Sequence, residues 1–185
     1  YDTLEEVIGI RPSNGSLAEY GVTYKQVDLL EDGSFDYDKI KKALNDKTKL
    51  VTIQRSKGYQ TRPSFSVAQI GEAIAFVKSL RPDVICMVDN CYGDFVETKE
   101  PIEVGADIIV GSLMKNLGGG VAKSGGYIVG RKDLIEDVAE RYSAPCIGKD
   151  IGANFNQLLS FFKGLYNAPT VVSSSLKTMT FAALM

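Results

Sequence analysis

The sequence predicts an α/β fold built on a mostly parallel sheet. Short β-branched or apolar runs alternate with longer segments of helical periodicity, which is the order of successive βαβ units. The run 84–88 is apolar at every position, as is typical of a strand buried on both faces. A chain of 185 residues, 44% hydrophobic and 24% charged, is long enough to bury one core. We therefore expect a sheet with helices on both faces.

Five segments have the composition of strands. The clearest are 48–54, which is rich in β-branched residues, and the apolar run 84–88. The other three predicted strands are 22–28, the run around Ile108 and 127–129.

The predicted helices begin at polar residues or lie between turn signals. Asp36 and Ser66 each precede an apolar-periodic segment and can cap it with a side-chain oxygen. A proline inside a helical pattern removes a backbone donor and tends to end the helix. The predicted helices are 2–8, 36–44, 66–80, 132–142 and, after residue 152, helices broken at Ala168-Pro169.

Three chemically useful side chains follow two of the predicted strands. Asp89 comes directly after the run 84–88, and Lys115 lies 26 residues further on, with Ser112 three residues before it. Ligands of parallel α/β sheets gather at the carboxyl ends of the strands, so we expect these side chains to share one edge. A lysine that forms a Schiff base, a carboxylate for a protonated pyridine nitrogen and a hydroxyl for a phosphate together suit pyridoxal 5'-phosphate.

Each of these residues also has a simpler interpretation. Asp89 is equally compatible with a solvated or capping carboxylate, and a Mg²⁺-binding Asp would need a glycine-rich GK[ST] loop that the chain lacks. Ser112 alone is equally compatible with a turn serine, and most lysines are exposed charges. Lys115 nevertheless lies between an apolar strand and the glycines 118–120, which would let backbone approach a flat ligand closely.

The polar loop 55–64 lies at the carboxyl end of a predicted strand, where binding groups tend to lie. Its basic residues Arg55, Lys57 and Arg62 are candidates for contact with a phosphate or a substrate carboxylate. We interpret at least two of them as surface charges. Tyr59 is equally compatible with a ligand contact and with an ordinary loop tyrosine.

Composition excludes several classes of function. A net charge of −2 provides no basic stripe for nucleic acid or an anionic membrane, and no apolar run approaches the roughly 20 residues of a membrane span. The chain has no histidine, and its three cysteines lack metal-ligand spacing, so we predict no metal site and reduced thiols in the cytoplasm. Cys91 and Cys146 show no sign of activation, and we interpret them as structural.

Two motifs resemble those of a known enzyme family. The stretch 88–92 (Val-Asp-Asn-Cys-Tyr), followed by Pro101 and by 105–119 with its Gly-Ala-Asp start, resembles the cystathionine lyase/synthase family of pyridoxal-phosphate enzymes. That family carries Asp-Asn-Thr-aromatic, then Gly-Ala-Asp-hydrophobic-Val-x-Ser-x-x-Lys with glycines following. The segments 54–59 and 116–120 resemble in particular the bacterial branch named aluminium resistance protein or methionine γ-lyase-like. The resemblance extends over nearly the whole chain.

This resemblance implies a carbon–sulfur lyase of a sulfur amino acid such as cystathionine or methionine, by β- or γ-elimination, with transferase activity as the variant. It implies Lys115 as the Schiff-base lysine that abstracts the α-proton, Asp89 as the pyridine partner and Ser112 as a phosphate ligand. Tyr1 aligns with a family tyrosine that stacks on the cofactor ring. Residues 1–185 would be the fold-type I large domain, truncated at both ends and without the small C-terminal domain. A homo-oligomer with sites at subunit interfaces is also implied.

The chain departs from the family pattern at two places. Met114 replaces the threonine that usually precedes the lysine, and 55–59 replaces the usual Ser-x-x-Asn-Pro loop. The family's glycine-rich phosphate segment and carboxylate-binding arginine are expected outside residues 1–185, so this piece alone is not expected to turn over substrate. Two other hypotheses stay open. One is a nucleotide- or phosphate-binding α/β module, and the other is a non-catalytic descendant linked to metal tolerance.

Overall fold

The computed structural model describes the whole chain except residues 1, 12, 151 and 153–154, and it describes no side chains for residues 2–4. The chain divides into two compact units, residues 1–45 and 46–185, which we describe separately. The prediction that 1–185 forms one truncated large domain stays a prediction.

The first unit contains α1 (Asp2–Ile8), the short 3-10 helix η1 (Leu17–Tyr20) and α2 (Tyr37–Ala43). Asp36 caps α2 as predicted, because its side chain accepts a hydrogen bond of 2.9 Å from the backbone N–H of Lys39. The predicted strand 22–28 is wrong, since this segment has no regular structure. A strand needs a neighbour for its backbone groups, and the hydrogen bonds here run along the segment, such as Gln26 to Asp28 at 2.7 Å.

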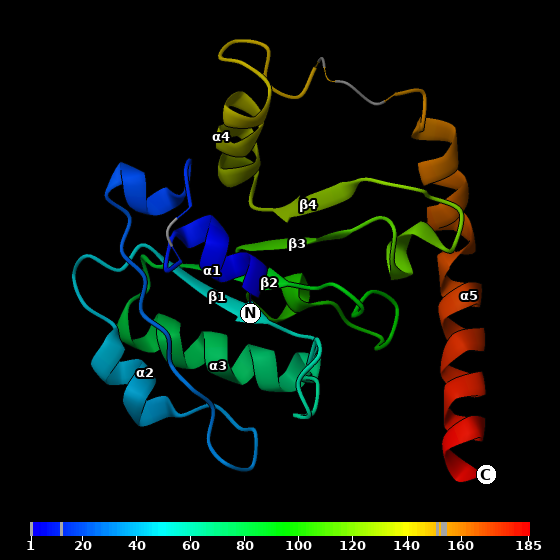
Figure 1. Cartoon of the computed structure of the whole chain (residues 1–185), viewed down its shortest axis with the longest axis horizontal. Helices are drawn as coiled ribbons and strands as arrows, with labels where there is room; N and C mark the ends of the chain where they lie inside the picture. The colour runs from blue at the N-terminus through cyan, green and yellow to red at the C-terminus, as the bar shows by residue number, and fades with distance from the viewer. Residues whose placement is uncertain (1, 12, 151, 153–154) are drawn as a thin grey trace. The chain divides into compact units, whose positions relative to one another are not determined.

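The second unit is built on a sheet with the strand order β1-β2-β3-β4 (Figure 1). β1 to β2 and β2 to β3 pair in parallel, whereas β4 is antiparallel to β3. The segment between β3 and β4 contains only a short 3-10 helix and no crossover helix, so β4 runs back beside β3 in the opposite direction. The prediction of a mostly parallel α/β sheet is confirmed. The strands are β1 (Leu50–Gln54), β2 (Ile85–Asp89), β3 (Ile108–Ser112) and β4 (Gly126–Gly130).

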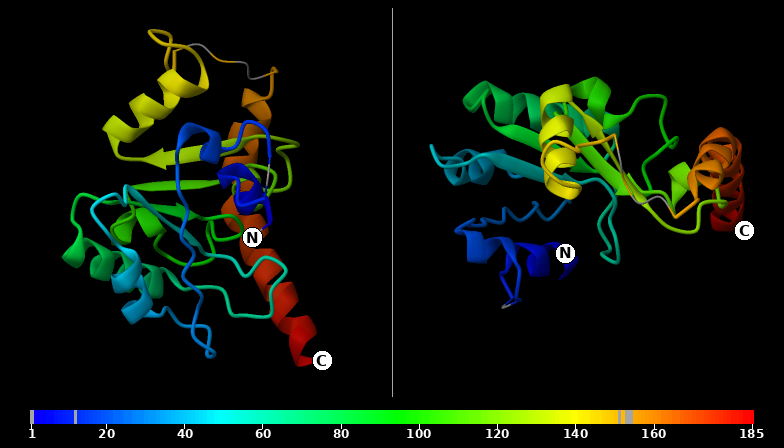
Figure 2. Two further views of the ribbon diagram at one scale, coloured as in Figure 1. Left: turned by 60° about the vertical axis from the view of Figure 1, so that its left-hand side comes forward. Right: turned by 90° about the horizontal axis from the view of Figure 1, so that it is seen from above.

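Helix α3 (Val67–Leu80) runs along one side of this sheet (Figure 2). Ser66 begins it with a capping box, because its hydroxyl accepts from the Gln69 backbone while the Gln69 side chain accepts from the Ser66 backbone. The apolar face of α3 is buried, and so are alternate residues of β2, as expected for a helix packed on a pleated sheet. The fully buried core residues include Ile70, Ile74, Val77, Val84, Cys86 and Val88.

Helix α5 (Leu158–Leu184) is continuous, so the predicted break at Ala168-Pro169 is wrong. Proline costs one helical hydrogen bond, but the neighbouring turns are held by packing because Ala168 and Val172 are buried. Figure 1 shows α5 standing beside the 3-10 helix η3 (Asn116–Gly118), which it contacts. No helix in the described part of the chain is long and apolar enough to cross a membrane.

The two remaining helical elements frame strand β3. The 3-10 helix η2 (Pro101–Val104) leads into β3, and α4 (Lys132–Tyr142) follows β4 as predicted. Between them lies Asp107, a buried carboxylate just before β3. It accepts hydrogen bonds from Lys78 Nζ at 2.6 Å and Arg131 Nη1 at 3.1 Å, together with the Cys86 backbone N–H at 2.8 Å. These contacts join α3, β2 and the end of β4 at one point.

Candidate functional site

The strand register places Asp89 and Ser112 on the same face of the sheet. Asp89 pairs with Val110 across the parallel β2–β3 ladder, and Ser112 lies two residues beyond Val110. Paired residues of adjacent strands face the same side, and side chains alternate along a strand, so both groups project from one face. Both are half-buried and both end their strands at the carboxyl edge, as the sequence predicted.

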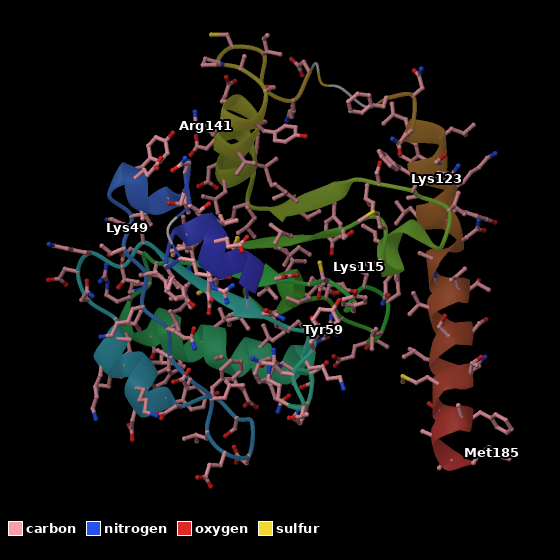
Figure 3. All side chains as sticks on the ribbon, viewed as in Figure 1. Lys49, Tyr59, Lys115, Lys123, Arg141 and Met185 are labelled. Atoms are coloured by element: carbon pink, nitrogen blue, oxygen red, sulfur yellow. The ribbon has the colours of Figure 1, made fainter. Side chains whose placement is uncertain are left out.

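Lys115 lies directly after this edge, at the start of η3 (Figure 3). Its backbone N–H donates to the carbonyl oxygen of Ser112 at 3.3 Å, and its side chain is half-buried. The Nζ atom lies 4.2 Å from the centroid of the Tyr92 ring. The structure therefore brings the predicted lysine, carboxylate and hydroxyl to one edge of the sheet.

Cys91 lies between two of these groups. Its backbone N–H donates to Asp89 Oδ1 at 3.0 Å, and its thiol is within hydrogen-bonding reach of Asp89 and Lys115. Burial raises the pKa of the Cys91 thiol, and the Asp89 hydrogen bond and charge raise it further against the opposing effect of Lys115. The thiol is thus not activated, in agreement with the sequence interpretation. Its place in the site was missed, although its position two residues after Asp89 could have indicated it.

The Ser112 hydroxyl already accepts a hydrogen bond from the backbone N–H of Met114, at 3.2 Å. This contact fixes the turn between β3 and Lys115 and leaves the hydroxyl proton for an external acceptor. Met114 itself is exposed and contributes no polar group. The turn thus presents one side-chain hydroxyl in this segment rather than the two of the family pattern.

The glycines after Lys115 have a different role from the predicted one. Gly118 and Gly119 are buried against α5, and a Cβ atom on Gly119 would lie 2.4 Å from the carbonyl oxygen of Gly164. The expectation that these two glycines let backbone approach a flat ligand is wrong, because the approaching surface is the helix backbone. Only Gly120 is exposed, with open space around it.

The basic loop after β1 is also mostly structural. Arg62 folds back on its own loop, donating to the carbonyl oxygens of Gln54 at 3.1 Å and Ser56 at 2.6 Å. Burial lowers the pKa of Arg62, whose guanidinium also lies 4.7 Å from the Phe65 ring centroid. Lys57 and Tyr59 are exposed, so Lys57 is the one exposed residue among the three basic residues of the loop. The prediction that at least two of the three are surface charges is wrong, because the other two bond groups of the protein itself.

Arg55 is neither a surface charge nor placed for an external ligand. Only 3% of the residue is exposed. Its Nη1 donates to Asn90 Oδ1 at 2.8 Å and to the Gly93 carbonyl at 3.0 Å, and its Nη2 bonds Glu97 Oε1 at 2.7 Å. Nη1 also lies 3.4 Å from Glu100 Oε2. The partners lie 35 to 45 residues along the chain, so no local pattern could have revealed them.

Asn90, directly after Asp89, was missed as an organising residue. It is fully buried, and its amide nitrogen donates to Asp94 Oδ1 and to Glu100 Oε2, both at 3.0 Å. We define the Asn90 cluster as Asn90, Arg55, Asp94, Glu97, Glu100 and Tyr127. It ties the ends of β1 and β2 to the loop 91–100 and so fixes the backbone that carries Asp89.

Asp94 holds an unusual position in the Asn90 cluster. It is buried, it accepts a hydrogen bond from the Tyr127 hydroxyl, and its Oδ2 atom has no hydrogen-bond partner among the described residues. Burial raises the pKa of Asp94, and the nearby Glu100 charge adds to this against the hydrogen bonds from Tyr127 and Asn90. Burial also raises the pKa of Tyr127, so the phenol keeps its proton. The pair is a buried carboxyl group whose pKa is raised, beside a neutral phenol.

The residues present fit a phosphorylated aldehyde cofactor such as pyridoxal phosphate. An amine, a carboxylate and a hydroxyl converge at one strand edge, which is the donor set that such a group needs. Within the described part of the chain, no group of three histidine, cysteine or acidic residues is arranged to hold a metal ion. Tyr1, the predicted stacking residue, lies outside the described residues.

Comparisons with known proteins place the chain in a family. A family model described as methionine gamma-lyase matches residues 1–185. The chain is 50% identical to the uncharacterized protein YnbB of Bacillus subtilis over 185 residues, which is 99% of this chain and 44% of that protein. L-methionine gamma-lyase of Treponema denticola is 28% identical over 125 residues, which cover 68% of this chain and 29% of that enzyme.

A solved structure agrees with this likeness. A carbon-sulfur lyase involved in aluminum resistance from Clostridium novyi superimposes with a TM-score of 0.90 and is 47% identical, over 96% of this chain and 43% of that chain. The chain therefore spans less than half the length of this structure and of the Bacillus subtilis relative. The resemblance inferred from the motifs around Asp89 and Lys115 is confirmed, and the chain belongs to the methionine gamma-lyase family.

Proposed function

We propose that the whole protein is a pyridoxal-phosphate-dependent carbon–sulfur lyase of fold type I, acting on a sulfur amino acid of the cystathionine or methionine type. The observation that carries the proposal is the convergence of Asp89, Ser112 and Lys115 at one carboxyl edge of the sheet. The names of the relatives support it, since they describe a methionine gamma-lyase and a carbon-sulfur lyase.

Each of the three residues would hold one part of the cofactor. Lys115 would bind it covalently through Nζ, Asp89 would pair with the protonated ring nitrogen, and Ser112 would donate its hydroxyl proton to the phosphate. Bound in this way, the cofactor supplies an electron sink for charge that develops at the substrate α-carbon. The carboxylate of Asp89 would keep the ring nitrogen protonated, which is the form that withdraws electrons.

Lys115 would also move the proton. Its Nζ atom, when not bonded to the cofactor, would be the nearby basic group that takes the α-proton, in a chain that has no histidine. The Cys91 thiol keeps its own proton because its pKa is raised, so it does not compete for this role. Loss of the sulfur group at the β or γ carbon would follow, and both alternatives, like transfer chemistry, remain within the proposal.

The Asn90 cluster would hold Asp89 in position for this chemistry. It fixes the backbone after Asp89 through buried hydrogen bonds, so the carboxylate need not be ordered when the cofactor binds. We also propose that the whole protein is a cytoplasmic homo-oligomer with sites at subunit interfaces, by analogy with the family. Sedimentation analysis of the whole protein tests the oligomer, and a monomer would contradict it.

The test is an absorbance spectrum of the whole protein purified with pyridoxal phosphate, before and after borohydride reduction, with Lys115→Ala in parallel. We expect a visible cofactor band that borohydride fixes onto Lys115 and that the variant lacks. Methionine and cystathionine are then assayed for release of a thiol and a keto acid, and activity should fall by at least a thousandfold in Lys115→Ala.

The outcomes separate the hypotheses left open by the sequence. A protein that stays colourless, or a band that survives in Lys115→Ala, would overturn the proposal in favour of a phosphate-binding module. A coloured protein that cleaves no sulfur amino acid would instead indicate a descendant that binds the cofactor without this activity. Lys123→Ala, at an exposed lysine of the same loop, is the matched control and should behave as the wild type.

A further inference from the structure

The Tyr92 ring lies where it can stabilise the positive charge of Lys115. The Nζ atom of Lys115 lies 4.2 Å from the ring centroid, within the range at which an aromatic face attracts an ammonium group. Tyr92 follows Asp89 by three residues and is 56% exposed, so packing in a core does not explain its position. Neither the sequence motifs nor the proposed function gives this residue a role.

The backbone of Tyr92 is strained. Its φ of 65° lies in the left-handed region, and Phe95 in the same loop has a φ of 60°. Bulky residues rarely adopt this conformation, and it persists only where the surrounding structure determines it more strongly than the local preference. Such outliers cluster at functional sites, and the outlier here is the residue whose ring contacts Lys115.

The loop is held from two sides. The side-chain amide of Asn116, the residue directly after Lys115, donates to the carbonyl oxygens of Tyr92 at 3.2 Å and Asp94 at 3.1 Å. From the other side, Arg55 Nη1 donates to the carbonyl oxygen of Gly93 at 3.0 Å. A Cβ atom at Gly93 would lie 2.5 Å from that Nη1 atom, so this close approach requires glycine. The ring and the lysine therefore belong to segments that are tied to each other.

We propose that Tyr92 is a positioning residue for Lys115, whose ring holds the lysine ammonium beside Asp89 while no cofactor is bound. The role of the held lysine rests on the proposed function, but the contact itself does not. The ring stabilises the charged and unreactive form of the amine, which must leave the ring before it can bond an aldehyde carbon. The aromatic face matters for this, and the hydroxyl does not.

The first test observes the contact directly in the cofactor-free whole protein. Lysines are converted to ¹³C-dimethyl lysines with formaldehyde and a borohydride reductant, which keeps their positive charge, and the Lys115 signal is assigned by its absence in Lys115→Arg. Methyl groups above an aromatic ring resonate upfield. We expect an upfield Lys115 signal in the wild type and in Tyr92→Phe, and its return to the ordinary lysine position in Tyr92→Leu.

The second test measures whether the Tyr92 contact slows the reaction of Lys115 with pyridoxal phosphate. Loss of a contact of this type corresponds to roughly a two- to fivefold change in rate, so Tyr92→Leu should capture pyridoxal phosphate faster by that factor while Tyr92→Phe matches the wild type. Tyr59→Leu, at an exposed tyrosine of the loop after β1, is the matched control and should change neither readout. Thermal melts confirm that each variant is folded.

The outcomes are distinct from those of the proposed function. An ordinary Lys115 signal in the wild type, or equal capture rates in Tyr92→Leu and the wild type, would overturn the inference even if the cofactor binds to Lys115. An upfield signal that Tyr92→Leu abolishes would support the contact even in a protein that never forms the cofactor band.

Discussion

Two charge clusters at opposite ends of the sheet, each built around one buried charged residue, differ in how their charges are balanced. At the amino end of β3, the single carboxylate of Asp107 meets two cations, Lys78 and Arg131. In the Asn90 cluster, at the carboxyl end of β2, the single guanidinium of Arg55 meets two carboxylates, Glu97 and Glu100. A third acidic residue, Asp94, is hydrogen-bonded to Asn90. The end that only supports the fold is compensated, and the end beside the candidate site is not. An excess of acidic groups around one buried cation costs stability, and proteins tolerate such a cost mainly where function depends on it.

The largest effect should come from removing the one cation of the Asn90 cluster. Arg55→Met leaves the buried Asn90 side chain and the Gly93 carbonyl without their donor, while Glu97 and Glu100 stay in contact with solvent. We expect the free energy of unfolding to fall by about 2–4 kcal/mol, since each buried polar group left unpaired costs about 1–3 kcal/mol. Urea denaturation of the whole protein measures this. Lys57→Met, at an exposed residue of the same loop, should leave the midpoint unchanged. A loss as small as that of the control would mean that the cluster does not depend on its guanidinium.

A smaller loss is expected at the compensated cluster. In Lys78→Met the carboxylate of Asp107 keeps Arg131 and the Cys86 backbone N–H, so the free energy of unfolding should fall by only about 1–3 kcal/mol. The same urea titration compares the two variants. If Lys78→Met proved as damaging as Arg55→Met, charge balance would not be what separates the two ends.

The two clusters should respond to pH in opposite directions. The pKa of Asp94 is raised above its ordinary value of 3.8 in the folded protein, so stability is lost as pH rises from that value through the folded pKa. Asp94→Asn should therefore gain stability at neutral pH relative to the wild type. The carboxyl faces Glu100, Asn90 and Tyr127, and all three remain in the variant.

For Asp107 burial raises the pKa, but the hydrogen bonds from Cys86, Lys78 and Arg131 outweigh it and lower the value. Its contribution is present above pH 3.8 and is lost as pH falls through the folded pKa, so Asp107→Asn should lose stability at neutral pH. Denaturation midpoints measured from pH 2 to pH 8, which includes the range below pH 3.8 where Asp107 titrates, compare each variant with the wild type (a tenfold change in proton affinity corresponds to about 1.4 kcal/mol). If the stability difference between variant and wild type changed with pH in the same direction for Asp94→Asn and Asp107→Asn, the opposite pKa shifts assigned to the two carboxyl groups would be contradicted.

The smallest effect is expected outside both clusters. Lys132 and Glu136 form an exposed ion pair at 3.7 Å on α4, and such pairs are screened by solvent. Lys132→Gln should leave the thermal midpoint unchanged within error. A clear loss there would show that exposed pairs contribute as the buried clusters do, and the comparison would lose its meaning.

The parts of the molecule that the sequence predicts well are those governed by local pattern. The capped starts at Asp36 and Ser66 and the strand runs that end at Gln54, Asp89 and Ser112 follow from composition within a few residues. Because parallel strands end at a common edge, the convergence of Asp89, Ser112 and Lys115 could be predicted as well.

The failures share one physical cause, which is that a distant partner decides the outcome. The segment 22–28 has strand-like composition but no neighbouring strand. Arg55 looks like a loop cation, yet its partners come from the loop that follows β2. Pro169 should end a helix, but α5 continues because the turns around it pack on η3. The site residues Asn90, Cys91 and Tyr92 were passed over for the same reason, since their contacts appear only once the strands are paired.

The glycine contact beside the lysine has a mechanical consequence. Gly118 and Gly119 touch Gly164 through backbone atoms alone, so no flexible side chain lies between η3 and α5 to absorb a displacement. A shift of α5 is therefore transmitted to the segment that starts with Lys115. The 27-residue helix extends well beyond this contact, so a small rotation of α5 about Gly164 would move its far end by a larger distance. A partner that binds the far end of α5 would therefore be able to displace η3 and, with it, the backbone that carries Lys115.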